Sequence, residues 1–598
     1  MLNKRTFVLV FFLLLVFNHA HALKPIPIQA GLLKLPSFQS HRDSKIEFTA
    51  LRRIFDIQGI PYDVLEHSSQ IDEYKTVFTA GSLLDKDTTP EVLNRLYDYV
   101  EGGGTLFSAG QIGKRLYPLF GVTHHAPSKH RYRLKFNGSN EALKYINRPE
   151  ELTISLGNGK KHFFDQVIWT HGYQKVGGTQ QLGTFEDGQG AFFHSQYGRG
   201  KSYLLGISYI DSVMRPQIGK DYEAQRSYVN AFEPSADVIM LIVKAVYETY
   251  TSPYVILSVI PYARRIALIL SHDVDAQTSF VDSIKFANLE ARFGVTSTFF
   301  ETTKTFVDAM DIDYYNIEEN RTAIRTLKQG GWDIGSHSVS HAKDFGTLPV
   351  GDPGISIAEY QPKTHKTIYG EVLISKQLLD RDISGQNTVS FRAGDLVFPI
   401  QLIGILQKSG YLYDSTFSAN DVLSAFPFFA FKDRIIGSEE SNIIEIPVTL
   451  DDALSFLTPK TINKVVKIWK EVVTANMENG GITVLLIHPS DTRNQDYKLK
   501  AQEELMQFVQ RRNGWMGNIR EFGDFFRHRQ QVKIKVFQKS NKDIIIQINP
   551  KNTHPMVGFI LGNTSLDISQ ISIQKNDRDP TQYKILKTGD VFKISSNP

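Results

Sequence analysis

A chain of 598 residues is too long for one hydrophobic core, so its length predicts two to four domains. Its 41% hydrophobic and 22% charged residues are typical of globular protein. The 67 Lys and Arg residues nearly balance the 63 Asp and Glu residues, which argues against nucleic acid as a partner. The chain has no cysteine, which excludes disulfides, thiolate metal ligands and a cysteine nucleophile.

Residues 1–22 have the three parts of a secretory signal peptide. A basic start, "MLNKR", precedes the apolar run "TFVLVFFLLLVF" and an A-x-A pattern that ends at Ala22. We expect cleavage after about Ala22; an uncleaved anchor is the alternative. No later apolar run approaches the roughly 20 residues of a membrane helix, so we expect no stable span after cleavage. An exported protein without cysteine fits a bacterial periplasmic or secreted location best.

Residues 25–250 alternate short strands with helices. "KTVFTAG" (75–81) and "TLFSAG" (105–110) flank a helix that begins near Pro90, which predicts a parallel sheet. Together with "YGRGKSYLLG" (197–206), this pattern resembles the amidotransferase-like, flavodoxin-like domain found beside some carbohydrate enzymes. Active members of that family use a cysteine nucleophile, so we expect a structural or ligand-binding role here.

Residues 254–529 repeat strand and helix in a way that predicts a barrel-like α/β domain. "RIALIL" (265–270) and "VTSTFF" (295–300) are typical of buried strands, and the segment between them has the pattern of a helix. The last segment, 532–598, alternates apolar and polar residues between turn-rich links. That alternation predicts a small antiparallel, sandwich-like β-domain.

Polar residues follow several of the predicted strands between 254 and 529. Since the carboxyl ends of the strands of an α/β barrel meet at one mouth, residues at those ends form a candidate active site. An Asp pair could mark only a turn, and a single Arg or His could be solvated or cap its strand. Four such strand ends in register favour a site; their residues are Asp273, Asp275, His337, His341, Arg392 and His488. Two histidines four apart share one side of a helical turn, and with a carboxylate they form a set suited to Zn²⁺.

The order "HDVD", "HSVSH", "FRAG", "YDSTF", "IHP" resembles the NodB-homology polysaccharide deacetylases of the carbohydrate esterase family four type. The resemblance implies a distorted (β/α)₇ barrel that binds a divalent metal and removes acetyl groups from N-acetylated sugars. It implies Asp275, His337 and His341 as metal ligands, with Zn²⁺ as the expected ion and Co²⁺ as an alternative. It further implies Asp273 as base, His488 as acid, Arg392 to orient Asp273, and Asp414 to orient His488.

The chemistry of amide hydrolysis fits these assignments. A metal supplies a nucleophilic water near neutral pH, a carboxylate accepts its proton, and a histidine protonates the leaving amine. The flanking regions resemble modules of exopolysaccharide-processing deacetylases, which implies an acetylated polysaccharide as substrate and exopolysaccharide-assembly proteins as partners. A peptidoglycan deacetylase and a non-catalytic carbohydrate-binding protein are the alternatives. His272, beside the predicted base, is expected to pack rather than to bind the metal.

Overall fold

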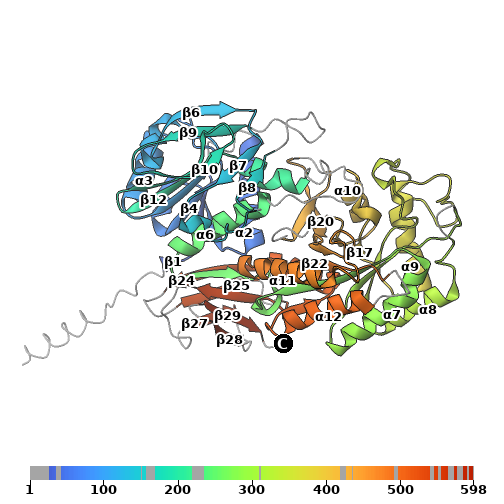
Figure 1. Ribbon diagram of the computed structural model, residues 1–598. Coiled ribbons are helices and arrows are strands. Elements are labelled where there is room, and N and C mark those ends of the chain that lie inside the picture. The colour runs from blue at the N-terminus through green and yellow to red at the C-terminus, as the bar shows by residue number, and fades with distance from the viewer. Residues whose placement is uncertain are drawn as a thin grey trace, which may run out of the picture.

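The computed structural model describes most of the chain and places three groups of β-sheet side by side (Figure 1). The described residues are 26–35, 42–149, 151–156, 169–218, 235–308, 312–417, 426–433, 436–489, 496–538, 544–549, 554–562, 571–575, 583–588 and 591–596. The predicted signal peptide lies outside them. Among the described helices, none combines the length and the apolar character needed to cross a membrane.

The first sheet has 11 strands and lies at the upper left of Figure 1. Its strands are β2 (Ala30–Leu33), β3 (Tyr62–Leu65), β4 (Thr76–Thr79), β5 (Thr105–Ala109), β6 (Val122–Ser128), β7 (Arg133–Phe136), β8 (Thr153–Ser155), β9 (Thr170–Lys175), β10 (Gln180–Phe185), β11 (Gly190–Tyr197) and β12 (Gly200–Leu205). Its helices are α2 (Arg42–Gln58), α3 (Pro90–Glu101), α4 (Tyr117–Phe120) and α6 (Ser235–Tyr250). The strands β3, β2, β4, β5 and β12 are parallel, and an antiparallel extension begins with β11.

The predicted strand–helix–strand unit of this region is confirmed. Helix α3 begins at Pro90, and the side chain of Thr89 accepts a hydrogen bond from the Val92 N–H. Proline suits the first turn because its missing N–H has no partner there in any case. The flanking strands β4 and β5 pair in parallel, with Thr76 opposite Thr105.

The second sheet is a half-barrel of ten strands. Its strands are β14 (Ala267–Val274), β15 (Thr298–Glu301), β16 (Asp333–Ser336), β17 (Ser390–Phe391), β18 (Tyr413–Asp414), β19 (Phe428–Phe431), β20 (Glu440–Glu445), β21 (Leu450–Asp451), β22 (Thr483–Leu486) and β23 (Trp515–Gly517). Its helices are α7 (Gln277–Arg292), α8 (Glu318–Gln329), α9 (Ser375–Asp382), α10 (Leu402–Lys408), α11 (Ile462–Asn479), α12 (Asp496–Gln510) and α13 (Ile519–Gln531). Among the described strands, β19 lies at one edge of the sheet and β21 at the other, and the two do not pair, so the barrel is open. The antiparallel β19 covers the edge of β20 that would otherwise be free to close the ring.

Helix α11 packs one apolar face against the half-barrel. Val465, Trp469, Val472 and Val473 are all buried on one face of the helix. Gly480 ends the helix with a φ of 76°, a left-handed conformation that costs glycine little. The helix thereby leads directly into β22, which carries a predicted site residue at its end.

Two four-stranded sheets contain the C-terminal strands. The first has the order β1 (Ile26–Pro27), β24 (Lys533–Gln538), β25 (Ile544–Asn549) and β27 (Ile571–Lys575). The second has the order β13 (Tyr254–Leu257), β26 (Gly558–Gly562), β29 (Val591–Ser596) and β28 (Tyr583–Thr588). The expectation of a purely antiparallel C-terminal domain is wrong, since β25 and β27 pair in parallel. The chain can cross over between them because residues 550–570 separate the two strands and include β26 of the other sheet.

Arg529, near the end of α13, joins three segments from distant parts of the chain. Its guanidinium is fully buried and donates to the backbone oxygens of Asp56, Ile57, Leu257 and Ser258 at 2.8–3.0 Å. Burial lowers the pKa of Arg529 to about 9. These contacts hold the end of α2 and the end of β13 against α13. The predicted domain boundaries, between residues 250 and 254 and between residues 529 and 532, stay a prediction. Strand pairs and hydrogen bonds join the segments on either side of both boundaries.

Candidate active site

Strand β14 carries the first two predicted site residues to the carboxyl edge of the half-barrel. All eight of its residues are buried, and it lies between β15 and β22 in the parallel sheet. Asp273 is 3% exposed and lies opposite Phe300 of β15. Val274 is buried in the apolar packing, as expected from the alternation of side chains along a strand. Asp275 follows the strand and is partly exposed.

Arg392 holds the Asp273 carboxylate in place. Its Nη1 donates to Asp273 Oδ1 at 2.8 Å, and its Nη2 donates to Ser271 Oγ at 2.9 Å. The Nε donates to the Ser415 carbonyl at 3.0 Å, and the guanidinium lies 4.3 Å from the centre of the Phe300 ring. Burial alone raises the pKa of Asp273, but the charges of Arg392, His337 and His488 and the hydrogen bond from Arg392 together outweigh it, so the pKa falls below its ordinary value of 3.8. Asp273 is therefore ionised, as a general base must be.

His337 follows strand β16 and presents one nitrogen toward Asp273. Its Nδ1 lies 2.8 Å from the Arg392 carbonyl, and since a carbonyl only accepts, Nδ1 carries the proton. The Nε2 then offers its lone pair and lies 3.7 Å from Asp273 Oδ2. Burial lowers the pKa of His337 to about 4, against the opposing charge of Asp273. A neutral imidazole with a free Nε2 is the form that binds metal.

The segment between His337 and His341 is a turn, so the expectation that both lie on a helical turn is wrong. Ser338 and His341 have positive φ angles of 70° and 48°. The turn forms because the buried Glu371, in the π-helical segment η8 (Gly370–Ile374), accepts hydrogen bonds from the backbone N–H groups of Val339 and Ser340 at 3.1 and 2.7 Å. The two imidazole centres are nevertheless 5.0 Å apart.

The His341 ring also packs against backbone. A Cβ added to Gly394 would lie 2.7 Å from that ring, so the close approach depends on glycine. The third predicted ligand, Asp275, lies close to both histidines. Its negative charge contributes to raising the pKa of His337 and that of His488. The donor set of two histidines and a carboxylate fits a divalent ion in its chemistry. Within the described chain, however, these three ligands are not all drawn together to within 4.8 Å.

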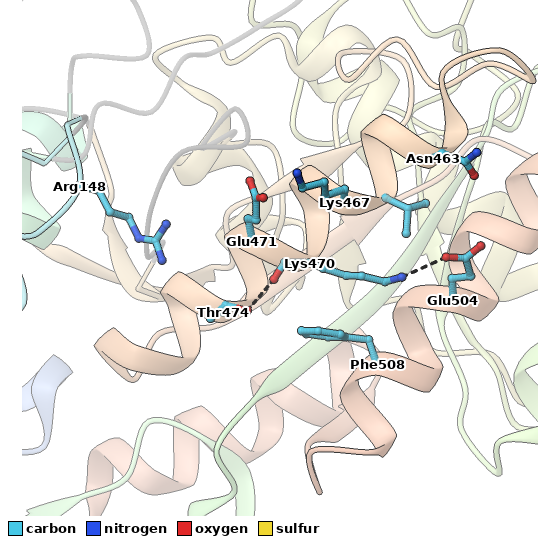
Figure 2. A pocket seen from close by; sticks show the side chains of 9 residues that line it. Arg148, Asn463, Lys467, Lys470, Glu471, Thr474, Glu504 and Phe508 are labelled. Atoms are coloured by element: carbon cyan, nitrogen blue, oxygen red, sulfur yellow. Dashed lines mark hydrogen bonds and ion pairs between the residues drawn. The ribbon is translucent and has the colours of Figure 1, made fainter.

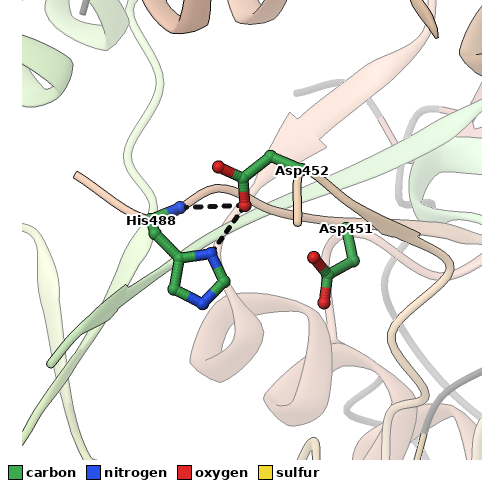
Figure 3. A group of neighbouring side chains, drawn as sticks. All are labelled: Asp451, Asp452 and His488. Carbon is green, nitrogen blue, oxygen red and sulfur yellow. Dashed lines mark hydrogen bonds and ion pairs between the residues drawn. The ribbon is translucent and has the colours of Figure 1, made fainter. Parts of the chain in front are cut away.

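His488 follows β22 and is held by a carboxylate that the sequence did not single out. Asp452 Oδ1 lies 2.6 Å from His488 Nδ1 and accepts a longer, 3.3 Å hydrogen bond from the His488 backbone N–H (Figure 3). Burial lowers the pKa of His488, but the charge of Asp452 and this hydrogen bond, together with the charges of Asp275 and Asp451, outweigh it, so the pKa lies well above 6.5. His488 is therefore an imidazolium, the form that can donate a proton.

The sequence-based pairing of Asp414 with His488 is not the one that forms. Asp414 instead accepts a hydrogen bond from Thr416 Oγ1 at 2.6 Å, and it lies opposite Glu445 on the adjacent strand β20. Burial raises the pKa of Asp414 to about 6. The order of the strands explains why Asp452, and not Asp414, reaches His488. Strand β21, which ends at Asp451, pairs with β22, the strand that precedes His488, whereas β14 and three further strands separate β22 from β18, which carries Asp414. The acidic pair "DD" at the end of β21 was the available signal for Asp452.

Asp451, Asp452 and His488 bring three donor atoms within 4.8 Å of one another, a cluster that could hold a metal ion. Their contacts favour another role. Lys498 Nζ lies 2.9 Å from Asp452 Oδ2, so a cation already balances that carboxylate. Asp451 accepts hydrogen bonds from the N–H groups of two following residues at 2.8 and 3.1 Å. We therefore interpret this cluster as the support of a protonated histidine.

A cavity of about 430 Å³ lies on the outer side of helices α11 and α12, and Figure 2 shows the side chains that line it. Lys470 Nζ pairs with Glu504 at 3.0 Å across it, and Arg148 reaches it from the first region of the chain. None of the predicted site residues lines this cavity. The ion pair between Lys470 and Glu504 joins the two helices, so we interpret this cavity as a groove between packed helices and not as the active site.

Comparisons with known proteins give distant structural likenesses. No protein-family model matches the sequence, and no curated protein matches it. The chain is similar to a putative polysaccharide deacetylase from Mycobacterium smegmatis, with 18% identity, 45% of this chain and 93% of that chain covered, and a TM-score of 0.32. It is similar to a CE4 family pseudoenzyme from Bacillus anthracis, with 12% identity, coverages of 44% and 66%, and a TM-score of 0.28.

A third solved structure is of another class. A β-galactosidase from Bacillus circulans has 12% identity, coverages of 39% and 34%, and a TM-score of 0.25. The structural neighbours thus include CE4 polysaccharide deacetylases, at low identity and partial coverage. At these scores the likenesses carry no argument about the reaction, which has to come from the geometry of Asp273, Arg392, His337 and His488.

Proposed function

We propose that the protein is a metal-dependent hydrolase that removes N-acetyl groups from a polymer containing N-acetylhexosamine. The observation that carries the proposal is the pairing of an ionised Asp273 with a protonated His488 at the same edge of one parallel sheet. Each of the two is held by a partner of opposite charge, Arg392 or Asp452. Amide hydrolysis needs one group that accepts a proton from water and another that donates a proton to the leaving amine.

Asp275, His337 and His341 are the residues that would hold the divalent ion, with Zn²⁺ as the expected metal and Co²⁺ as an alternative. When bound there, the ion would lower the pKa of a water molecule to about 7 and polarise the acetyl carbonyl. The proton on His337 Nδ1 supports this role, because it leaves Nε2 as the ligand atom.

The side chains of this protein then have defined tasks. Asp273 accepts the proton of the attacking water, and Arg392 keeps it ionised and fixed in direction. As the new C–O bond forms and the C–N bond breaks, His488 gives its proton to the nitrogen of the sugar. The products are acetate and a free amine on the polymer. Asp452 stabilises the charged His488 before this transfer, and Lys498 balances Asp452 afterwards.

Export, substrate identity and the first region of the chain belong to the same proposal. The signal-peptide pattern at residues 1–22 supports a periplasmic or secreted enzyme, where exopolysaccharide or peptidoglycan would be the acetylated polymer. The amidotransferase-like region, which lacks cysteine, would bind glycan or a partner protein. A sugar-binding protein without turnover would have no use for a charged histidine opposite a buried carboxylate.

The test is acetate release from a panel of N-acetylated glycans, including an N-acetylglucosamine polymer and peptidoglycan, with and without a chelator. We expect release that stops with the chelator and returns with added Zn²⁺ or Co²⁺. The matched control is Asp273→Asn, which should release no acetate. Release that is indifferent to the chelator and to this variant would refute the proposal.

A further inference from the structure

A buried polar pair lies directly behind the candidate base, on the opposite face of strand β14. Ser271 and Asp273 face Arg392, whereas His272 between them faces helix α7. His272 is 1% exposed, and its ring stacks on Phe299 with the centres 4.7 Å apart. Its Nε2 lies 2.9 Å from Oε1 of Glu290, a residue of α7 that is fully buried.

The Glu290 carboxylate is held from several sides. Oε1 accepts a hydrogen bond from Gln502 at 2.8 Å, and Oε2 accepts from Ser297 Oγ at 2.8 Å and Trp332 Nε1 at 2.7 Å. These donors come from α12, from the segment before β15 and from the segment before β16. A buried carboxylate with so many partners cannot shift without leaving polar groups unsatisfied. Glu290 therefore fixes the orientation of the His272 ring.

The other nitrogen of His272 reaches the strand that carries the candidate acid. Nδ1 lies 2.9 Å from the carbonyl oxygen of Ile487, so Nδ1 is the donor. The Ile487 N–H donates to the Ser271 carbonyl at 3.1 Å. The peptide groups on both sides of Ile487 are thus tied to β14, and the residue that follows is His488.

We propose that His272 and Glu290 are positioning residues that fix the distance between Asp273 and His488. The proposal rests on the proposed function, because it assigns base and acid to those two residues. Three consecutive residues of β14 form the frame: Ser271 binds Arg392 and the Leu485 carbonyl, His272 binds the Ile487 carbonyl, and Asp273 is the base itself. Misplacing a catalytic group by about 1 Å can cost about 10²-fold in rate.

The His272 ring packs against Phe286 and Phe299, and an aromatic apolar residue would keep these two contacts. What an apolar residue lacks is the hydrogen bond to Ile487 and the polar contact with Glu290. The informative variants are therefore His272→Phe, which keeps an aromatic ring, and His272→Asn, whose side-chain N–H can replace Nδ1–H. Glu290→Gln keeps the shape of the carboxylate but turns an N–H group toward its donors. His171→Phe is the matched control, a largely buried histidine of strand β9.

The kinetic test measures kcat, KM and metal content on the N-acetylated polymer that the wild type deacetylates. We expect His272→Phe and Glu290→Gln to lose about 10²-fold in kcat, with KM and bound metal unchanged. His272→Asn should recover at least tenfold over His272→Phe, and His171→Phe should keep wild-type kcat. Equal kcat values for His272→Phe and His272→Asn would overturn the proposal.

A second measurement does not depend on activity. In protein with ¹³Cε1-labelled histidine, the His488 signal is identified from its loss in His488→Gln. That signal should move in His272→Phe, stay near its wild-type position in His272→Asn, and stay unchanged in His171→Phe. If the wild type releases no acetate, the proposed function fails, but the His488 signal still shows whether His272 fixes the position of His488 against β14. An unmoved His488 signal in a folded His272→Phe protein would show that His272 only packs.

Discussion

Replacing Arg392 by Met should destabilise the half-barrel because it leaves a buried charge without its partner. Arg392 is fully buried, and Asp273 is only 3% exposed. Removing one partner of a buried ion pair costs about 3–5 kcal/mol, since the remaining ion has lost both water and counter-charge. Methionine keeps the apolar stem of the arginine but is shorter and lacks the guanidinium, so the loss combines the unpaired charge and the lost hydrogen bonds with a small cavity.

The companion variant Asp273→Asn should cost less, about 1–3 kcal/mol, because Arg392 keeps its bonds to Ser271 and Ser415. In the double variant neither charge is left unpaired, so its loss should be smaller than the sum of the two single losses. We expect a coupling of about 2 kcal/mol between the two sites.

The pH dependence gives the sign of the effect. In the wild type the pKa of Asp273 is lowered, so its stabilising contribution is complete above about pH 4 and is lost as the pH falls through its folded pKa. Without Arg392, burial raises that pKa. The deficit of Arg392→Met should then shrink between pH 7 and pH 5, as Asp273 takes up a proton.

Urea unfolding followed by tryptophan fluorescence measures these quantities. Three of the four tryptophans, at positions 332, 469 and 515, lie in the half-barrel region. Losses that add to within about 0.5 kcal/mol, or a deficit for Arg392→Met that is equal at pH 7 and pH 5, would refute the reasoning.

Three further outcomes test the site. Asp452→Asn should lower kcat by about 10²-fold or more. Because the pKa of His488 falls without that carboxylate, the alkaline limb of the pH profile of kcat should move to lower pH. The control variant Asp414→Asn should leave this limb in place. Metal analysis of purified protein should find about one divalent ion, which Asp273→Asn should retain and Asp275→Ala should lose, and an ion-free wild type that gains no activity with Zn²⁺ would contradict the site. Purified protein should hydrolyse no glutamine, because residues 25–250, whose sequence resembles an amidotransferase domain, contain no cysteine; measurable glutaminase activity would contradict the structural or ligand-binding role expected of them.

The sequence predicted those parts of the site that depend on single strands. A polar residue directly after an apolar run lies at the carboxyl edge of a parallel sheet, which placed Asp273, His337 and His488 correctly at one edge. The contact between Arg392 and Asp273 was implied by family resemblance, and the 2.8 Å hydrogen bond agrees with it.

The partners of the site residues could not be predicted in the same way. Whether Asp414 or Asp452 reaches His488 depends on which strand lies next to β22, and strand order is a property of the whole sheet. The spacing of His337 and His341 suggested a helix because a four-residue separation is helical by default. The turn that forms depends on Glu371, which is distant in the sequence. The parallel pairing of β25 and β27 is likewise invisible in the alternation of either strand.

The pairing of β1 with β24 and of β13 with β26 also sets an order of events during synthesis. Strand β1, at residues 26–27, is made long before its partner at residues 533–538. Closing so long a loop costs entropy before any contact repays it, so these two sheets should assemble last. A fragment that stops at residue 531 would leave β1 and β13 with open edges, which invite aggregation. Expression fragments of the half-barrel should therefore either keep the C-terminal strands or begin after residue 257.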